Sequence, residues 1–375
     1  MADLPAFTFG IEEEYHLART DTDALGDGSD ALIEACTAAL GDCVSREFLK
    51  SQIEVGTKPN TKFQAAREEL VHLRQGIATA AAAFGLAPVA TGTHPMSRRK
   101  ETQRSDNERY VGLEEELGGT VRRLVACGMH VHIGIDDEDM RVDVMNQVRY
   151  FIPHLMALAT SSPFWERENT GLKCFRSVLL DGMPRTGLPV DFGSFNEYRR
   201  TIDVLISAGV IEDASKIWWD LRPSTKYPTL ELRALDVCTD VDDAIAIAAV
   251  YVCLCRMLFR LRRFNMRWRN YSVFLINENR WRAQRYGIES TLFDFGQSAL
   301  VPYAQLLDEL LELIAEDADA LGCTDAVQHT RTIVARGTSA DMQRKMFAEK
   351  TDAGATPEDA LQAIARELRA QTVQR

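Results

Sequence analysis

Phe-Gly-Ile-Glu-Glu-Glu-Tyr, residues 9–15, is the clearest strand signal in the chain. Across residues 7–17 the large apolar side chains Phe9, Ile11 and Tyr15 point one way, and polar side chains, among them Glu12 and Glu14, point the other. Alternation with a period of two is typical of a β-strand with one buried face. The stretch therefore predicts a strand whose apolar face packs on the core and whose opposite face carries carboxylates.

Other predicted strands, far away in the sequence, repeat this design. Residues 51–55, 127–135 and 229–235 each combine an apolar face with a face that carries ionisable or amide groups. The polar positions are Gln52 and Glu54, His130 and His132, and Glu231 and Arg233. Because residues i and i+2 of a strand share a face, each pair can reach one ion or two adjacent ions.

The rest of the chain is predicted to be mostly helical. Amphipathic patterns and capping residues predict helices at 29–40, 62–84, 142–161, 195–208 and 242–263, a short strand at 87–91, and loops at 92–107 and 162–195. Strands and helices do not alternate regularly, which favours an α+β fold: an antiparallel sheet of about six strands with helices packed on one face. We expect residues 1–375 to form a single catalytic domain with a helical tail from about residue 337, either a peripheral hairpin or a partner-facing element.

Composition limits the partners and the compartment. Lys and Arg total 43 against 55 Asp and Glu, a formal charge of −12, so we expect no general attraction to nucleic acid or to an anionic membrane. The N-terminus lacks the pattern of a secretory signal, and the apolar stretch 244–261 contains Arg256 and Arg260, which is typical of a buried helix. Eight cysteines without a C-x-x-C pair indicate free thiols, so we expect a cytoplasmic protein.

Carboxylates gathered on one sheet face predict bound cations. Several carboxylates on one surface repel each other and stay ionised only if cations lie between them. Oxygen ligands with at most one imidazole suit Mg²⁺ or Mn²⁺ better than zinc. The alternative is an ordinary solvated sheet face, although Glu is depleted in strands. The chain has no Walker P-loop, no G-x-G-x-x-G and no G-x-S-x-G, which argues against the common nucleotide folds and serine hydrolases.

Several motifs together resemble one family. The chain is similar to the carboxylate–amine ligases, the second type of glutamate–cysteine ligase. The motifs that carry this resemblance, in order, are Phe9–Tyr15, Gly92–Pro95, Cys127–Gly134, Ser162–Trp165, Arg222–Arg233 and Glu278–Arg282. They span about residues 7 to 290, which is most of the chain.

The resemblance implies a fold, a cofactor set and roles for single residues. The fold would be like the catalytic domain of glutamine synthetase, with the site on the concave face of a curved antiparallel sheet. Arg233 would contact the transferred phosphate or the substrate carboxylate, and Arg176 would hold the amino acid substrate. Lys226 and Arg222 would contact phosphates, and His132 would orient substrate or a water molecule. Two or three Mg²⁺ ions, with Mn²⁺ as an alternative, would be held against the phosphates of ATP by Glu12, Glu14, Glu54, His130 and Glu231.

The implied reaction joins a carboxylate, expected to be the side chain of glutamate, to an amine such as cysteine through an acyl phosphate. The residues are also compatible with two other functions: a metal-dependent amide hydrolase, which would act without nucleotide, and a non-catalytic relative that binds nucleotide or an amino acid. Apolar helices beyond the number that one sheet face needs predict a homodimer.

Overall fold

The computed structural model of the protein describes residues 7–105, 112 and 115–374. Residues 1–6, where the sequence predicts no secretory signal, lie outside the described residues. Residues 106–107 of the predicted loop and residue 375 of the predicted domain lie outside them as well.

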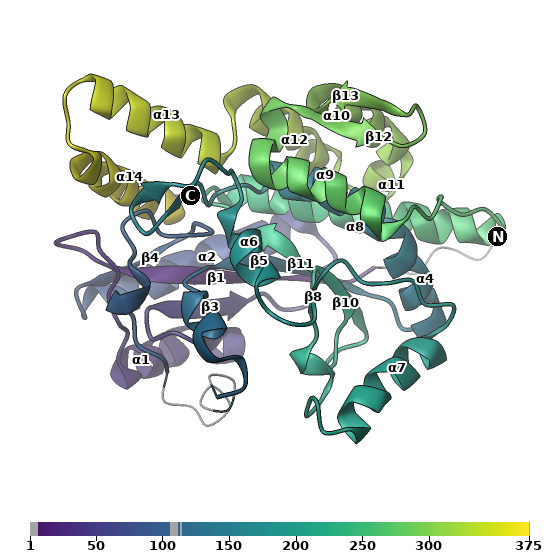
Figure 1. The fold of residues 1–375 in the computed structure, drawn as a ribbon, viewed down its shortest axis with the longest axis horizontal. Coiled ribbons are helices and arrows are strands. Elements are labelled where there is room, and N and C mark those ends of the chain that lie inside the picture. The colour runs from purple at the N-terminus through teal and green to yellow at the C-terminus, as the bar shows by residue number, and fades with distance from the viewer. Residues whose placement is uncertain (1–6, 106–111, 113–114, 375) are drawn as a thin grey trace.

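A seven-stranded sheet organises the fold, and β1 (Phe9–Arg19) runs through its middle (Figure 1). The strands follow the order β10-β11-β5-β1-β3-β2, and β4 pairs with the second half of β1 beyond the end of β5. Every pairing in this sheet is antiparallel. The other strands are β2 (Val44–Arg46), β3 (Gln52–Gly56), β4 (Leu86–Val89), β5 (Gly128–Gly134), β10 (Leu221–Pro223) and β11 (Thr229–Asp236).

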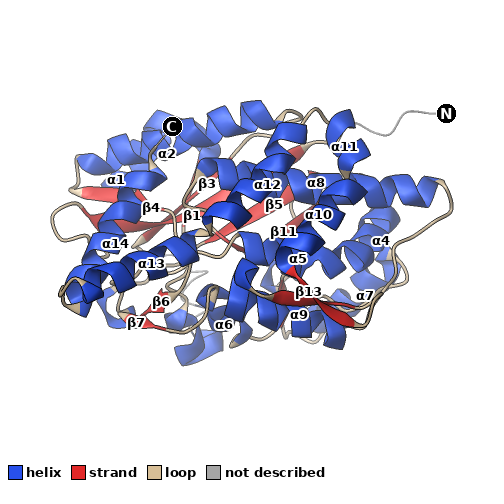
Figure 2. Cartoon of the chain, turned by 90° about the horizontal axis from the view of Figure 1, so that it is seen from above, coloured by secondary structure: helices blue, strands red, loops and turns tan. Residues whose placement is uncertain are grey.

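Helices cover the apolar face of this sheet, and Figure 2 shows them from above, lying over the strands. Over β1, β5 and β11 the apolar face packs against α8, whose Tyr251 hydroxyl donates to the carbonyl of Leu230 at 3.3 Å. Near β3 and β4 it packs against α1 and α2. The helices concerned are α1 (Asp30–Leu40), α2 (Phe63–Ala82), α4 (Glu138–Val148), α5 (Ile152–Leu158) and α8 (Val241–Arg263). The predicted α+β class, with helices on one face of an antiparallel sheet, is confirmed.

Helix α8 is the centre of the helical layer. It is long and apolar enough to cross a membrane by length and composition, but most of it is buried inside the structure, as the sequence predicted. The side chain of Asp240 caps its first turn. Around it lie α9 (Val273–Tyr286), α10 (Tyr303–Leu313), α11 (Ala315–Ala320) and α12 (Thr324–Arg336), with the hairpin β12 (Thr291–Asp294) and β13 (Ala299–Pro302).

The predicted continuous helix at 142–161 is wrong. Helix α4 begins earlier, at Glu138, because the side chain of Asp137 accepts the N–H of Met140 and caps it. The chain then makes a short 3-10 turn at 149–151 and continues as α5. Pro153 near the start of α5 has no N–H to donate to the preceding turn, so an unbroken helix would lose a hydrogen bond there.

The predicted loop at 162–195 contains a helix, α6 (Phe175–Asp181), which the sequence analysis missed. Short strands flank it: β6 (Phe164–Trp165), β7 (Glu168–Asn169), β8 (Thr186–Gly187) and, further along, β9 (Trp218–Trp219). The edge strands β2 and β10 were also missed, because three residues are too few to show alternation. Helix α7 (Phe195–Ser207) forms as predicted, with Ser194 as its cap.

The C-terminal tail forms the hairpin of α13 (Ser339–Asp352) and α14 (Pro357–Thr372). It is anchored in the body of the protein at both ends. At its start the Gln343 side chain donates to the carbonyl of Ser161 at 3.0 Å, and at its end the Thr372 hydroxyl accepts the N–H of Ala90 at 2.8 Å. The tail is therefore part of the packed structure and covers the β4 edge of the sheet.

A buried ion pair lies beneath β1. The carboxylate of Glu13 is fully buried on the apolar side, where the guanidinium of Arg74 from α2 donates to it at 2.9 and 2.6 Å. Arg74 also donates to the carbonyls of Thr239 at 2.6 Å and Cys238 at 2.8 Å, just beyond β11. These hydrogen bonds connect the central strand β1, helix α2 and the segment that follows β11.

We expect Arg74→Met to destabilise the protein by about 3–5 kcal/mol, because it leaves the Glu13 carboxylate buried without a partner. Urea unfolding would measure the change. The matched control is Arg331→Met, which breaks the exposed pair between Arg331 and Asp308 and should cost less than about 1 kcal/mol. Equal costs for the two variants would contradict the importance of the buried pair.

Candidate active site

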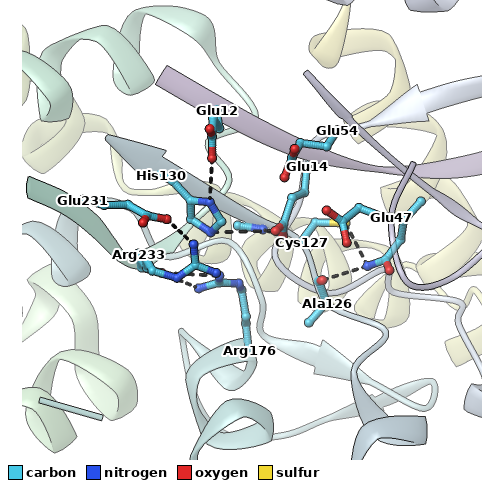
Figure 3. Close-up of polar contacts among 12 residues, drawn as sticks. Glu12, Glu14, Glu47, Glu54, Ala126, Cys127, His130, Arg176, Glu231 and Arg233 are labelled. Atoms are coloured by element: carbon cyan, nitrogen blue, oxygen red, sulfur yellow. Dashed lines mark hydrogen bonds and ion pairs between the residues drawn. The ribbon is translucent and has the colours of Figure 1, made fainter. Parts of the chain in front are cut away.

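Strand register brings the predicted polar side chains onto one face of the sheet (Figure 3). Glu12 lies opposite His130, and Glu14 lies opposite Glu54. On the next strand Glu231 lies opposite His132. Residues from four strands that are far apart in the sequence therefore meet in one row.

The side chains form groups in which the ligand atoms all lie within 4.8 Å of one another. Adjacent groups share a carboxylate, so they form a continuous series along the face. The groups are Glu12, His132 and Glu231; Glu12, Glu54 and His130; and Glu14, Glu47 and Glu54.

Glu47 is a site residue that the sequence analysis missed. It follows β2 in an irregular segment, where its carboxylate accepts the N–H of Phe48 at 3.0 Å and lies beside Glu14 and Glu54. No alternation marks such a position in the sequence. Its neighbour Ser45, on β2, donates to the Glu54 carboxylate at 2.7 Å, so the missed strand contributes a further contact to the site.

Charges at the Glu231 end of the row are balanced within the protein. Burial alone would raise the pKa of Glu12, but the adjacent imidazoles of His130 and His132 outweigh it and hold the pKa well below its usual range. For Glu231, burial is likewise outweighed by Arg233 and Arg222, which lower the pKa of its carboxyl. These two carboxylates are therefore ionised at neutral pH.

Charges at the Glu47 end are not balanced in the same way. Burial, and then repulsion from Glu54 and Glu14, raise the pKa of Glu47 well above its usual range. Burial and repulsion from Glu12 and Glu14 also raise the pKa of Glu54. Carboxylates that resist ionisation next to each other become stable anions when a cation binds among them.

The residues present fit divalent cations. Among the residues that the structure describes, no hydrogen-bond partner meets the buried Nε2 atoms of His130 and His132, which lie 3.7 Å from Glu14 and 3.4 Å from Glu12, respectively. Each group offers at most one imidazole among carboxylate oxygens, which is the donor set of Mg²⁺ or Mn²⁺.

Two arginines stand beside the carboxylates. Arg233 forms an ion pair with Glu231 on the same strand. Arg176, from α6, donates to the backbone carbonyl of Arg233 at 3.3 and 3.4 Å (Figure 3). Its guanidinium lies directly over Gly128. A methyl group on Gly128 would come within 2.1 Å of Nη2 of Arg176. The absence of a side chain at Gly128 therefore makes room for Arg176.

Arg222 and Lys226, which were predicted to contact phosphate, both contact other groups of the protein in the structure. Arg222 donates to Glu231 at 3.0 Å and to the carbonyls of Ile217 at 2.5 Å and Ser215 at 3.2 Å, so it holds Glu231 in place. Lys226 is exposed on the turn between β10 and β11, where its ammonium lies over the Tyr227 ring, and it lines a neighbouring cavity. The structure does not bring Lys226 into the row of carboxylates.

A cavity of about 450 Å³ opens over the carboxylates. Its lining is partly apolar and includes Leu180, Met183 and Trp218. The ionisable residues that line it include Glu12, Glu14, Glu47, Glu54, His130, Arg176, Arg222 and Arg233. A space that holds acidic metal-binding groups and arginines together is suited to enzymes that bind and transfer phosphoryl groups.

The chain belongs to glutamate–cysteine ligase family 2 (GCS2), whose sequence profile matches residues 8–365. A protein of Rhodospirillum rubrum, provisionally named glutamate–cysteine ligase 2, is 54% identical over 374 residues, covering 98% of this chain and 96% of the relative. A relative from Paracoccus denitrificans with the same provisional name is 49% identical over 97% of each chain. The resemblance inferred from the motifs is confirmed, and the protein is an ATP-dependent carbon–nitrogen ligase.

Solved structures share the fold at low sequence identity. A glutamate–cysteine ligase from Francisella tularensis, solved in complex with AMP, superposes with a TM-score of 0.71 at 14% identity, covering 100% of this chain and 90% of that one. A bifunctional glutathione synthetase from Pasteurella multocida gives a TM-score of 0.70 at 15% identity, covering 98% of this chain and 53% of that one.

We expect Gly128→Ala to reduce ligase activity by about a hundredfold, because the added methyl group must displace the Arg176 guanidinium from its place beside Arg233. The fold should survive, since the end of a long side chain can move. The matched control is Gly10→Ala on the neighbouring strand β1, where a methyl group would meet nothing nearer than 3.9 Å. Steady-state kinetics and thermal unfolding of both variants would check this, and full activity of Gly128→Ala would contradict it.

Proposed function

We propose that the protein joins the side-chain carboxylate of glutamate to an amine, with cysteine as one acceptor, and drives the reaction with ATP. The observation that carries the proposal is the row of three ligand groups, of which Glu12, Glu14, Glu47, Glu54 and His130 line one cavity together with Arg233 and Arg176. Phosphoryl transfer depends mainly on positioning and on neutralising charge, which this arrangement provides. Glutamate and cysteine come from the names of the family and of the similar proteins.

The carboxylates of the row, together with the imidazole of His130, are proposed to hold Mg²⁺. Bound there, the ions would neutralise the negative charge between the ATP phosphates and the substrate carboxylate. The ligands we propose are the predicted Glu12, Glu14, Glu54, His130 and Glu231, with Glu47 added on the basis of its position in the third group.

Arginines and His132 are proposed to bind and orient the substrates. Arg233 would contact the transferred phosphoryl group, and Arg176 would bind a carboxylate of the amino acid substrate, because a guanidinium matches both anions in geometry. His132 is held by a hydrogen bond of 2.9 Å between its Nδ1 and the Thr229 hydroxyl, which fixes the orientation of its ring. Arg222 would act indirectly, by holding Glu231.

The reaction would proceed in two steps. First, a carboxylate oxygen of the substrate attacks the γ-phosphorus of ATP, the bond to the β–γ bridging oxygen breaks, and ADP leaves behind an acyl phosphate. Second, the amine nitrogen attacks the acyl carbon, the bond between this carbon and the phosphate oxygen breaks, and the amine loses a proton as the amide and inorganic phosphate form. Neither step needs a nucleophilic side chain of the enzyme.

The test is ADP release from Mg-ATP with glutamate as donor and a panel of amines varied one at a time, with the product identified by mass spectrometry. We expect release that depends on both glutamate and an amine. Glu12→Gln should nearly abolish ADP release while the circular dichroism spectrum and the unfolding transition stay close to those of the unchanged protein, because it removes a carboxylate shared by two ligand groups.

Other outcomes would favour other functions. Amide cleavage without nucleotide would indicate a metal-dependent hydrolase. Nucleotide binding by calorimetry without ADP release for any amine would indicate a non-catalytic relative. Full turnover of Glu12→Gln would contradict the metal assignment.

We expect the Mg²⁺ affinity of the nucleotide-free protein to rise with pH. Burial and repulsion from Glu54 raise the pKa of Glu47, so at low pH its carboxyl holds a proton that must leave before a cation binds. Glu47→Gln should weaken Mg²⁺ binding by about tenfold or more and flatten this pH dependence. Calorimetric titration at several pH values would measure both, with Glu68→Gln on the exposed side of α2 as the control. A pH-independent affinity in the unchanged protein would contradict the role of Glu47.

A homodimer and a cytoplasmic location stay predictions. The dimer was predicted from apolar helices beyond the number that one sheet face needs. One apolar helix, α8, is covered by α12 of the same chain. Light scattering would test the dimer, and a monomeric mass would contradict the prediction.

A further inference from the structure

Two motifs that the metal groups leave unexplained meet around one buried residue. Gly92–Pro95 and Ser162–Trp165 both come close to Asp236, the last residue of β11. Glu231 and Arg233 belong to the same strand. Asp236 itself lies outside the cavity lining.

Three donors bind the Asp236 carboxylate. It accepts the N–H of Ser161 at 2.9 Å, the hydroxyl of Ser162 at 2.6 Å and the thiol of Cys174 at 3.2 Å. Burial raises its pKa, and Arg176 and these hydrogen bonds act in the opposite direction. A side chain at Gly92 would meet the carboxylate carbon at 2.6 Å, so only glycine leaves room for it.

Ser162 connects Asp236 to the first turn of α6. The backbone N–H groups at the start of a helix lack partners within the helix, and the side chain of the capping residue Cys174 makes no capping bond here. Ser162 provides the missing acceptors: its carbonyl accepts the N–H of Phe175 at 3.1 Å, and its hydroxyl oxygen accepts the N–H of Arg176 at 3.1 Å. Because the hydroxyl hydrogen goes to Asp236, a lone pair on the oxygen is free to face Arg176.

Arg176 is thus fixed at both ends. Ser162 accepts a hydrogen bond from the backbone N–H of Arg176. The guanidinium of Arg176 occupies the space over Gly128 and donates to the carbonyl of Arg233. A shift of the first turn of α6 would move the guanidinium relative to Arg233 and the carboxylates. The far end of α6 is also held, since Asp181 accepts two hydrogen bonds of 2.8 Å from Arg280.

We propose that Asp236 and Ser162 are positioning residues that set the place of the Arg176 guanidinium and so determine the affinity of the site for the carboxylate substrate. This inference rests on the proposed role of Arg176 in binding that substrate. Asp236 acts through Ser162 and Arg176, because its carboxylate already accepts three hydrogen bonds within the protein.

The test compares two adjacent buried serines. Ser162→Ala removes the hydroxyl that joins Asp236 to Arg176, and it should raise KM for glutamate about three- to tenfold while KM for ATP stays the same. Ser161→Ala is the matched control: its hydroxyl binds the N–H of Gly92 and the carbonyl of Val237, both at 2.8 Å, and makes no bond to α6. It should lower thermal stability without changing KM for glutamate. Asp236→Asn, if it folds, should resemble Ser162→Ala.

A double variant separates positioning from general loss of structure. Arg176→Lys removes the planar guanidinium and should itself raise KM for glutamate. Ser162→Ala added to Arg176→Lys should then raise KM no further, because the group that Ser162 positions is already gone. Independent, multiplicative effects of the two substitutions would overturn the inference.

The outcomes also distinguish this inference from the proposed function. Normal turnover with the same KM for glutamate in Ser162→Ala and Ser161→Ala would overturn the positioning role and leave the ligase function intact. Absence of glutamate binding by the unchanged protein in calorimetry, with Mg-ATP or without it, would overturn both.

Discussion

Glu13 lies between Glu12 and Glu14 on the central strand β1. Its buried ion pair with Arg74 constrains the register of this strand and the position of the end of β11. A shift of β1 by one residue would expose Glu13 on the site face and push its two neighbours into the apolar core. Arg74 is buried and needs a carboxylate partner, so β1 must keep the register that places Glu13 on the apolar face of the sheet. Arg74 also binds the carbonyls that follow β11, so the same guanidinium sets the end of the strand that carries Glu231 and Arg233.

The two ends of the row of carboxylates differ in how easily their carboxyl groups ionise. Histidines and arginines hold Glu12 and Glu231 as anions, whereas burial and mutual repulsion keep Glu47 and Glu54 from ionising easily. The first end is organised by the protein alone, and the second gains a stable charge state when a cation binds. A row of carboxylates with this gradient can hold its shape without ligand and still offer carboxylate oxygens to cations along its length.

Much of the site could be predicted because its residues follow strand alternation. Glu12, Glu14, Glu54, His130 and Glu231 lie on one face as their spacing indicated. Glu47 could not be found this way, since it lies in an irregular segment brought close only by the pairing of β2 with β3. Nor could the sequence reveal that Gly128 makes room for Arg176, because this contact joins a strand to a helix 48 residues away that was predicted to be a loop. The phosphate contacts of Lys226 and Arg222 were predicted from the resemblance and stay predictions, and in the structure Arg222 donates to Glu231.

The C-terminal hairpin of α13 and α14 also supports the region around α6 through contacts between residues far apart in the sequence. Lys173, just before α6, is buried between Asp341 of α13 and Glu289. Gln343 of the same helix donates to the carbonyl of Ser161, which also accepts the hydroxyl of Thr91 at 2.6 Å. The hairpin therefore contacts the chain on both sides of Ser162, the residue that holds the first turn of α6. A segment that the sequence predicted to be a peripheral hairpin or a partner-facing element thus supports the part of the fold that carries Arg176, and the candidate site depends on segments far apart in the sequence.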